Sequence, residues 1–319
     1  MDLAKELKEG LCSRPKYIPV SLRYDHQGLQ YDEQCFDLDE YYHYRAEEAL
    51  IKSSIKDVVS NLCIPCKVFD IGCGNTKKAQ MLLNELLQYQ NTVEYAPIDV
   101  SKDFLNEVCD VLFQIYGDSL KVDPMSDDLF QALSKIGNYR GRKALLWISG
   151  LQIFPKDTQL KMLSNISSTL EGNDVCLITA DITQNKEVIE KAYLNFDEQR
   201  PNAKLYTNGI HVLNREFEAN IDISQFKLEG KYVEDKDVSS ASCVQVWLRS
   251  LCKQSYNIEK LGITMTLEEG EKLMLHGGNG MSHKYTSNQL EYLFAKAHLR
   301  VLNKWENENS ALFLCKREM

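Results

Sequence analysis

The residues best suited to chemistry stand in one short segment, Val68-Phe-Asp-Ile-Gly-Cys-Gly74. An apolar run there ends in an acidic residue and a pair of glycines, and a helical pattern begins near Thr76. Glycines at the carboxyl end of a strand let the backbone pass close to a ligand, and open α/β sheets bind their cofactors at that end. The segment therefore predicts a strand, a cofactor-binding turn and a helix in succession.

A second acidic residue, Asp99, ends the next apolar run, 95–100. A carboxylate in that position can accept hydrogen bonds from both hydroxyls of a cofactor ribose. It can equally serve as the N-cap of the following helix, a role that Ser101 is also able to fill. A dinucleotide site needs a third glycine where this chain has Lys77, so the pattern favours the turn of methyltransferases that use S-adenosylmethionine (SAM).

The elements that must position these residues alternate between strands and helices. We expect strands at 67–71, 93–100, 119–123, 144–148 and 175–180, and helices at 48–61, 77–88, 102–116, 127–136 and 158–170. Strands separated by helices of this length imply βαβ units and a parallel sheet. A final helix near 286–297 and strands at 299–305 and 310–316 match the closing hairpin of this methyltransferase fold.

Between these segments the pattern changes. Residues 1–47 show little periodicity and 186–220 look helical, whereas 226–233, 242–251 and 256–265 read as strands of antiparallel hairpins. We therefore predict an α/β fold, a Rossmann-like methyltransferase sheet with an inserted α+β substrate-binding domain. The methyltransferase domain is predicted from 48–182 and 282–319, and the substrate-binding domain from 1–47 and 183–281.

Composition excludes several classes of protein. The 319 residues carry a formal net charge of −9, which argues against a nucleic-acid partner. The charged N-terminus lacks the apolar core of a secretory signal, and no run of about 18 apolar residues predicts a membrane span. We expect a cytoplasmic monomer with reduced thiols. Cys63 and Cys66 form a lone CxxC, which can be redox-active or half of a zinc site, but no second pair completes four ligands, so no metal is expected.

Motifs along most of the chain share residue types and spacing with one known family. They are Tyr24-Asp25, Glu40-Tyr-Tyr42 with Arg45-Ala-Glu47, Gly72-Cys-Gly-Asn-Thr-Lys-Lys78, Pro97-Ile-Asp99-Val, Ala192-Tyr193, Asn214-Arg-Glu-Phe217, Glu269-Gly-Glu271 and Ser282-His-Lys-Tyr285. With them the chain resembles the histidine-specific amino-acid N-α-methyltransferases of ergothioneine biosynthesis and their fungal dimethylallyltryptophan N-methyltransferase relatives. The resemblance implies a SAM-dependent N-methyltransferase acting on the α-amine of a small amino-acid-like molecule.

The same resemblance implies roles for individual residues. The cofactor contacts it implies are Tyr41, Gly72, Lys78, Asp99, Asp127 and Asp128, the last two near the adenine. Tyr41 is also the catalytic candidate, as a hydrogen-bond partner near the transferred methyl group. Tyr24 and Tyr193 correspond to tyrosines that hold the substrate carboxylate, and Ser282 to a residue at its side chain. Tyr24 and Tyr193 can alternatively be half-buried core tyrosines, and Lys78 a solvated helix residue.

Three further substrate-site positions depart from the family pattern. Gln152 stands where an asparagine is expected, Gly280 where histidine-specific members place an imidazole-reading glutamate, and Val246 where a longer side chain is common. Loss of that carboxylate removes the charge-assisted partner of an imidazole and leaves a larger, less polar pocket. A tryptophan-like or tyrosine-like amino acid is then the better substrate, and histidine stays possible if His283 or Gln152 compensates.

Two other classes of function remain open on the sequence. A non-catalytic binding protein on the same fold would explain the changes at Gln152, Gly280 and Asp128, although the intact Gly72 and Asp99 argue against it. A methyltransferase of a decarboxylated amine or of a macromolecule is the other alternative. Macromolecular substrates call for an open and often basic surface, which an acidic chain does not favour. No general base stands at the matching positions, so proton loss to water is expected to suffice.

Overall fold

A computed structural model describes residues 3–276 and 281–318 and divides the chain into two compact units. Unit 1 consists of Met1–Tyr44, Gln184–Lys236 and Ser242–His283. Unit 2 consists of Arg45–Thr183, Asp237–Ala241 and Lys284–Met319. The divisions lie close to the predicted ones, except that Asp237–Ala241 joins unit 2. That segment is tied there by Gln289, whose Nε2 donates to the carbonyl of Asp237 at 2.9 Å.

Unit 2 is built on an eight-stranded sheet in the order β14-β15-β7-β6-β2-β3-β4, with β5 paired to β3. Its strands are β2 (Lys67–Ile71), β3 (Val93–Asp99), β4 (Leu120–Val122), β5 (Met125–Ser126), β6 (Lys143–Trp147), β7 (Val175–Asp181), β14 (Leu299–Glu306) and β15 (Ser310–Arg317). The strand pairs from β7 through β4 are parallel, and β15 pairs antiparallel with both β7 and β14. The predicted Rossmann-like sheet with its closing hairpin is confirmed.

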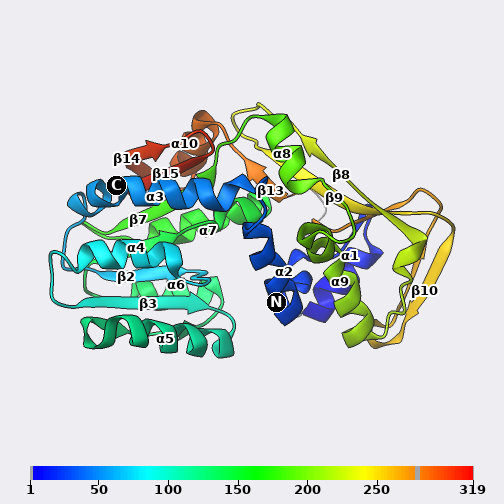
Figure 1. Ribbon diagram of the computed structural model, residues 1–319, viewed down its shortest axis with the longest axis horizontal. Helices are drawn as coiled ribbons and strands as arrows, with labels where there is room; N and C mark the ends of the chain where they lie inside the picture. The colour runs from blue at the N-terminus through cyan, green and yellow to red at the C-terminus, as the bar shows by residue number, and fades with distance from the viewer. Residues whose placement is uncertain (1–2, 277–280, 319) are drawn as a thin grey trace. The chain divides into compact units, whose positions relative to one another are not determined.

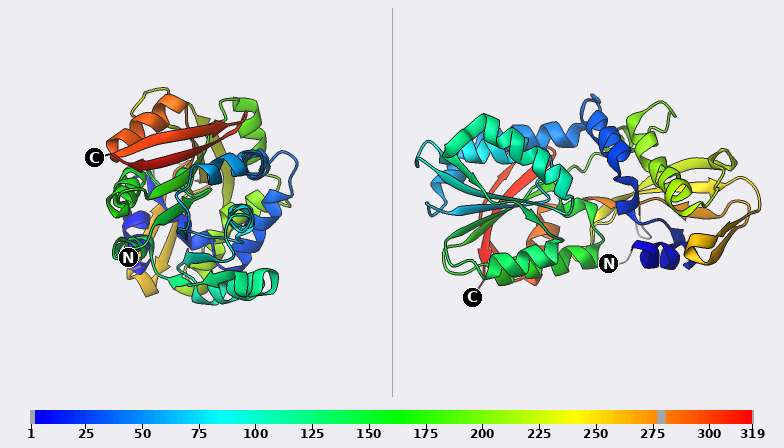
Figure 2. Two further views of the ribbon diagram at one scale, coloured as in Figure 1. Left: turned by 90° about the vertical axis from the view of Figure 1, so that its left-hand side faces the viewer. Right: turned by 90° about the horizontal axis from the view of Figure 1, so that it is seen from below.

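Helices cover both faces of this sheet. One apolar core joins it to α3 (Tyr42–Ser60), α4 (Lys77–Leu86) and α5 (Lys102–Tyr116), and a second core joins the other face to α6 (Leu129–Gly137), α7 (Lys156–Thr169) and α10 (Ser287–Lys296) (Figures 1 and 2). Because the central strands are buried on both faces, they read as continuous apolar runs, which is why the sequence pattern located them. Helix α3 begins at Tyr42, earlier than the predicted residue 48.

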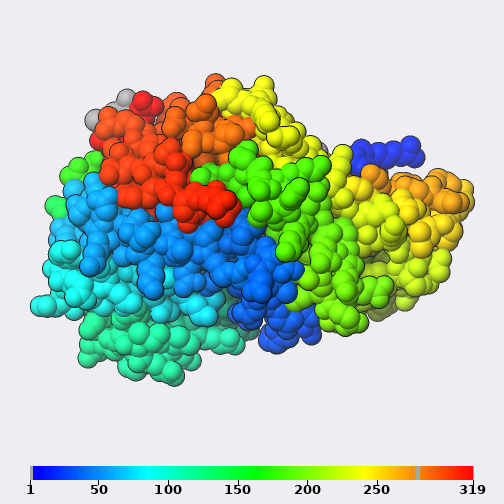
Figure 3. Space-filling model, turned by 45° about the horizontal axis from the view of Figure 1, so that its top comes forward, coloured from blue at the N-terminus to red at the C-terminus, as the bar shows by residue number. Residues whose placement is uncertain are grey.

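The C-terminal hairpin also contacts α3. The indole Nε1 of Trp305 donates to Asp57 Oδ2 at 2.8 Å, and the amide of Asn307 donates to the carbonyl of Ala46 at 2.6 Å. In the space-filling view the last strands, in red, lie directly against α3, in blue (Figure 3). Residues from the two ends of the unit 2 sequence are thereby held together.

In its described residues, unit 1 has a mixed sheet, four α-helices and short 3₁₀ helices. Its elements are α1 (Leu3–Cys12), β1 (Lys16–Tyr17), α2 (His26–Phe36), α8 (Lys186–Tyr193), α9 (Pro201–Phe217), β8 (Phe226–Val233), β9 (Ser242–Ser250), β12 (Lys272–Met274) and β13 (Met281–Lys284), with β10 (Gln254–Ile258) and β11 (Ile263–Leu267) as a separate pair. The strand predicted over 256–265 is wrong, because the chain turns back there. Gly262 has φ +61°, a left-handed conformation that allows the β10–β11 hairpin.

The described residues bear on three features considered from the composition, namely disulfides, metal sites and membrane-spanning helices. No disulfide joins two cysteines in residues 3–276 and 281–318. Over 3–276 and 281–318, no group of three or more His, Cys, Asp or Glu is placed to hold a metal ion. Within the same ranges no helix combines the length and apolar character that crossing a membrane requires.

A buried ion pair lies at the end of β7. The ammonium of Lys284 is 2.7 Å from Asp181 Oδ2, and neither side chain has any exposed surface. Asp181 Oδ1 also accepts from the backbone N–H of Thr183 at 3.0 Å. Charges this deep in a protein are tolerated only when they are paired and hydrogen-bonded, so the two side chains depend on each other.

We predict that Lys284→Met lowers the free energy of unfolding of unit 2 by about 3–5 kcal/mol, because it leaves the Asp181 carboxylate buried without its partner. Adding Asp181→Asn removes that charge and should restore part of the loss. Urea denaturation followed by fluorescence measures both, with Lys102→Met, at an exposed position, as the control expected to stay within about 0.5 kcal/mol. A Lys284→Met variant as stable as the control would contradict the prediction.

Candidate functional site

The glycine turn lies where the sequence placed it, between β2 and α4 at the carboxyl edge of the unit 2 sheet. Gly72 has φ +65° and Gly74 φ +51°, so both adopt the left-handed conformation that side chains disfavour. A Cβ atom added at either position would meet nothing within 4 Å. The glycines are therefore required for conformation, and open space adjoins the turn, as a bound cofactor would need.

Asp99 ends β3 at the same edge. Its Oδ1 accepts from the backbone N–H of Ser101 at 2.9 Å, and burial raises the pKa of its carboxyl group. The N-cap of α5 is Ser101, whose hydroxyl accepts from the N–H of Phe104 at 3.3 Å. Asp99 is consequently not the cap of that helix, and its carboxylate suits the predicted role toward two ribose hydroxyls.

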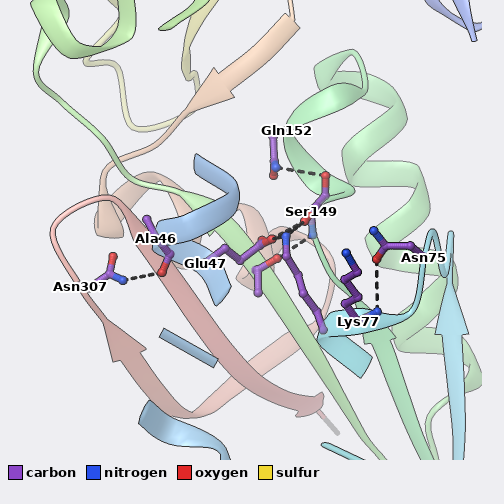
Figure 4. A network of polar contacts seen from close by, with 9 residues as sticks. Ala46, Glu47, Asn75, Lys77, Ser149, Gln152 and Asn307 are labelled. Atoms are coloured by element: carbon purple, nitrogen blue, oxygen red, sulfur yellow. Dashed lines mark hydrogen bonds and ion pairs between the residues drawn. The ribbon is translucent and has the colours of Figure 1, made fainter. Parts of the chain in front are cut away.

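A buried polar cluster ties three elements together at this edge (Figure 4). Lys78 in the first turn of α4 donates to Glu47 of α3 and, at 2.8 Å, to Ser149 Oγ after β6. Ser149 Oγ also donates to Glu47, which has no exposed surface, and Ser149 has φ +60°. Lys78 is only 9% exposed, so the alternative of a solvated helix residue is wrong.

The other predicted residues of unit 2 have structural partners of their own. Gln152 is buried and its Nε2 donates to the carbonyl of Ser149 at 3.1 Å, beside the cluster. Asp128 is the N-cap of α6 and accepts from the N–H groups of Phe130 and Gln131. Asp127 binds the ammonium of Lys135 through both carboxylate oxygens, at 2.8 and 2.7 Å. Contacts of the two aspartates with an adenine stay a prediction.

Burial controls ionisation around the glycine turn. Asp70, in β2, accepts from the phenol of Tyr95 at 2.6 Å, and burial raises its pKa to about 6. Cys73 stands between the two glycines, and burial, with the charges of Asp70 and Asp99, raises the pKa of its thiol well above the usual value. The turn therefore holds a protonated thiol at physiological pH.

In unit 1 the predicted tyrosines gather partly into one aromatic group. The rings of Tyr41 and Tyr193 have centroids 5.3 Å apart, and Tyr42 meets Tyr193 edge-on at 6.4 Å. Burial raises the pKa of Tyr41 well above its usual value and raises that of Tyr24 as well. These phenols are neutral hydrogen-bond donors near neutral pH, and Tyr41 is unsuited to act as a base.

The remaining predicted substrate residues lie in the sheet of unit 1 or outside the described ranges. Val246 in β9 is fully buried in the apolar core. Ser282 in β13 has φ +51°, and its Oγ is 3.4 Å from Nε2 of His276. Gly280 lies outside the described residues, so its predicted role is not assessed by the structure.

Sequence reasoning missed two residues beside this group, Arg23 and His276. Arg23 is 6% exposed; its Nη1 lies 3.0 Å from His276 Nδ1, and its Nη2 donates to the Tyr24 hydroxyl at 3.3 Å. A lone arginine before a tyrosine and a lone histidine before a glycine-rich loop carry no motif. Glu47 and Ser149 were also given no role, although Glu47 stands inside one of the quoted motifs.

Comparison with known proteins extends these observations to the whole chain. The model of the histidine-specific, SAM-dependent methyltransferase family matches residues 3–317. A histidine N-alpha-methyltransferase from Mycobacterium tuberculosis (strain CDC 1551 / Oshkosh) is 24% identical over 308 residues, covering 96% of this chain and 91% of the relative. A 4-dimethylallyltryptophan N-methyltransferase from Arthroderma benhamiae (strain ATCC MYA-4681 / CBS 112371) is 24% identical over 324 residues, covering 96% of this chain and 90% of the relative.

The position of Asp99 generates a binding prediction. Asp99→Ala should weaken SAM binding tenfold or more, because hydrogen bonds to a charged group contribute about 1.5–3 kcal/mol. Isothermal titration calorimetry with SAM measures this, and Asp118→Ala, at an exposed position of unit 2 with no predicted cofactor role, is the comparison. Unchanged affinity in a folded Asp99→Ala protein would refute the ribose assignment.

Proposed function

The chain belongs to the family of histidine-specific, SAM-dependent methyltransferases, and from this membership we propose that it methylates the α-amine of a small amino acid with an aromatic side chain. The observation that carries the proposal is the family match over residues 3–317 together with the two donor tyrosines, Tyr24 and Tyr193, at family-matching positions. Histidine and 4-dimethylallyltryptophan, the compounds in the names of two relatives, each carry an aromatic ring on an amino-acid backbone.

The carboxyl edge of unit 2 supplies the groups that would hold the cofactor. Gly72 and Gly74 leave space beside the backbone, and Asp99 presents a carboxylate that Ser101 frees from helix capping. SAM, when bound, supplies an electrophilic methyl group on its sulfonium. The chain's own contribution is then to orient the amine and to exclude water, since electrophile activation belongs to the cofactor.

The tyrosines of unit 1 suit the recognition of a carboxylate. Tyr24 and Tyr193 are the proposed donors, and the raised pKa of Tyr24 keeps its phenol protonated. Two phenol donors match the two oxygens of one carboxylate. Tyr41, whose pKa burial also raises, would act as a hydrogen-bond partner near the amine and not as a base. The ammonium then loses its proton to water before methyl transfer.

The proposed side chain is aromatic but not restricted to imidazole. Gly280 stands where the acid that would pair with an imidazole is expected. Extra apolar area buried by a larger ring stabilises binding by about 25 cal/mol per Å². Tryptophan-like and tyrosine-like amino acids are therefore proposed ahead of histidine.

The assay that tests the proposal compares kcat/KM for histidine, tryptophan, tyrosine and their decarboxylated amines with SAM. The kcat/KM of each amino acid should exceed that of its decarboxylated amine. The kcat/KM of tryptophan or tyrosine should exceed that of histidine. Better turnover of every amine would refute recognition of the carboxylate, and a preference for histidine over all others would refute the pocket argument.

A variant isolates the carboxylate contact. Tyr193→Phe should raise KM for the preferred amino acid about tenfold or more, since it removes one donor to a charged group, while KM for the matching amine stays unchanged. Tyr256→Phe is the control, because this hydroxyl bonds Gln254 in the β10–β11 hairpin and has no proposed substrate role. Equal effects of Tyr193→Phe on acid and amine would contradict the assignment.

A further inference from the structure

A buried arginine in unit 1 serves no function assigned so far. Arg23 ends the 3₁₀ helix η1 (Val20–Arg23), and its guanidinium lies over the rings of Tyr24 and Tyr206, 5.1 and 5.2 Å from their centroids. Its Nε has no hydrogen-bond partner in the described part of the chain. The charge of Asp32 acts on it, but no ion pair or hydrogen bond joins those two side chains in the described ranges. A buried cation without a bonded carboxylate calls for an explanation.

The contact with His276 has a defined direction. A guanidinium can only donate, so His276 Nδ1, 3.0 Å from Arg23 Nη1, must be the acceptor. The histidine is then neutral and carries its proton on Nε2. The ring is 1% exposed and packs edge-on against Tyr206 at 5.1 Å, which fixes its orientation. Its Nε2–H faces Ser282 Oγ at 3.4 Å and donates to it.

The hydrogen bond from His276 determines where the hydroxyl proton of Ser282 can point. Its oxygen accepts from His276, so its own hydroxyl proton is directed to another acceptor. In the described ranges the Ser282 side chain makes no other hydrogen bond. It is partly exposed between the buried Met281 and His283, and it has φ +51°. A serine held in that conformation is uncommon and marks a position whose geometry its surroundings impose.

We propose that Arg23, His276 and Ser282 form a donor chain that reads a hydrogen-bond acceptor at the end of the substrate side chain. The inference rests on the proposed function, in which Ser282 contacts that side chain, and it narrows the substrate class. A carboxylate or a phenol oxygen satisfies the Ser282 donor, whereas a cationic group does not. Sites built on a hydrogen bond reject analogues that leave the buried partner unpaired.

Matched phenylalanine derivatives test the proposal. The wild type should show kcat/KM for 4-carboxyphenylalanine about ten- to hundredfold above that for phenylalanine, as expected for one hydrogen bond to a charged group. Tyrosine should fall between the two, and the cationic 4-aminomethylphenylalanine below phenylalanine. Equal rates for the four compounds, or a preference for the aminomethyl compound, would overturn it.

Ser282→Gly isolates the last donor of the chain. Glycine accepts the positive φ without strain, so this variant removes the CH2OH side chain without straining the backbone. It should abolish the preference, so that kcat/KM for 4-carboxyphenylalanine falls about ten- to hundredfold relative to that for phenylalanine. A preference that survives Ser282→Gly would place the acceptor contact elsewhere and overturn the proposal.

Arg23 acts through His276 and is a positioning residue, so its test follows the imidazole directly. ¹⁵N NMR of the wild type should show His276 as the neutral tautomer protonated on Nε2. Arg23→Met should mix the two His276 tautomers and weaken the preference for 4-carboxyphenylalanine over phenylalanine. Arg23→Lys should retain part of the single tautomer and part of the preference. Asp32→Asn should leave the tautomer and the preference unchanged. A wild-type His276 protonated on Nδ1 overturns the proposal even if Arg23→Met does not fold.

Failure of the proposed function is distinguishable from failure of the donor chain. If no amino acid in the panel is methylated, the proposed function is wrong. Calorimetry then still tests the donor chain, by comparing the affinities of 4-carboxyphenylalanine and phenylalanine for the wild type and for Ser282→Gly. Tighter binding of the carboxy compound that depends on Ser282 supports it, and equal binding refutes it.

Discussion

The buried carboxylate of Glu47 is the group on which the carboxyl edge of the unit 2 sheet depends. It has no exposed surface, and a carboxylate removed from water is costly unless cations and hydroxyls surround it. Lys78 and Ser149 meet that need. They bring the first turn of α4 and the end of β6 against α3, so the glycine turn of Gly72 is anchored on both sides. This explains why a glutamate far from the turn in sequence belongs to the same group of motifs.

The prediction succeeded where local pattern and structure coincide. The acid and glycines after β2 and the acid at Asp99 follow from strands whose burial on both faces makes them apolar and easily recognised. Over 254–267 the same reasoning failed, because Gly262 folds what looks like one strand into a hairpin. Helices α1 and α2 were missed. Helix α2 depends on the N–H of Gly28 donating to the Asp25 carboxylate and on packing against α9, neither of which periodicity expresses.

Only those site residues that stand in a local sequence motif could be predicted from the sequence. Arg23 and His276 lie 253 positions apart in the sequence, and neither stands in a recognisable motif. Their pairing is a product of tertiary structure, in which η1 and the residues directly after β12 come together. Lys78 stands in a motif and was singled out from the sequence. Its ion pair with Glu47 could not be predicted, because the partner comes from a distant part of the chain.

The protonated thiol of Cys73 has a consequence for chemoselectivity. A thiolate is the most powerful nucleophile among the side chains, and an alkylating cofactor would modify one that stood next to its binding turn. Burial and the neighbouring carboxylates raise the pKa of Cys73, so the reactive form is suppressed without replacing the residue. This thiol should therefore resist alkylating reagents and oxidants for as long as unit 2 stays folded.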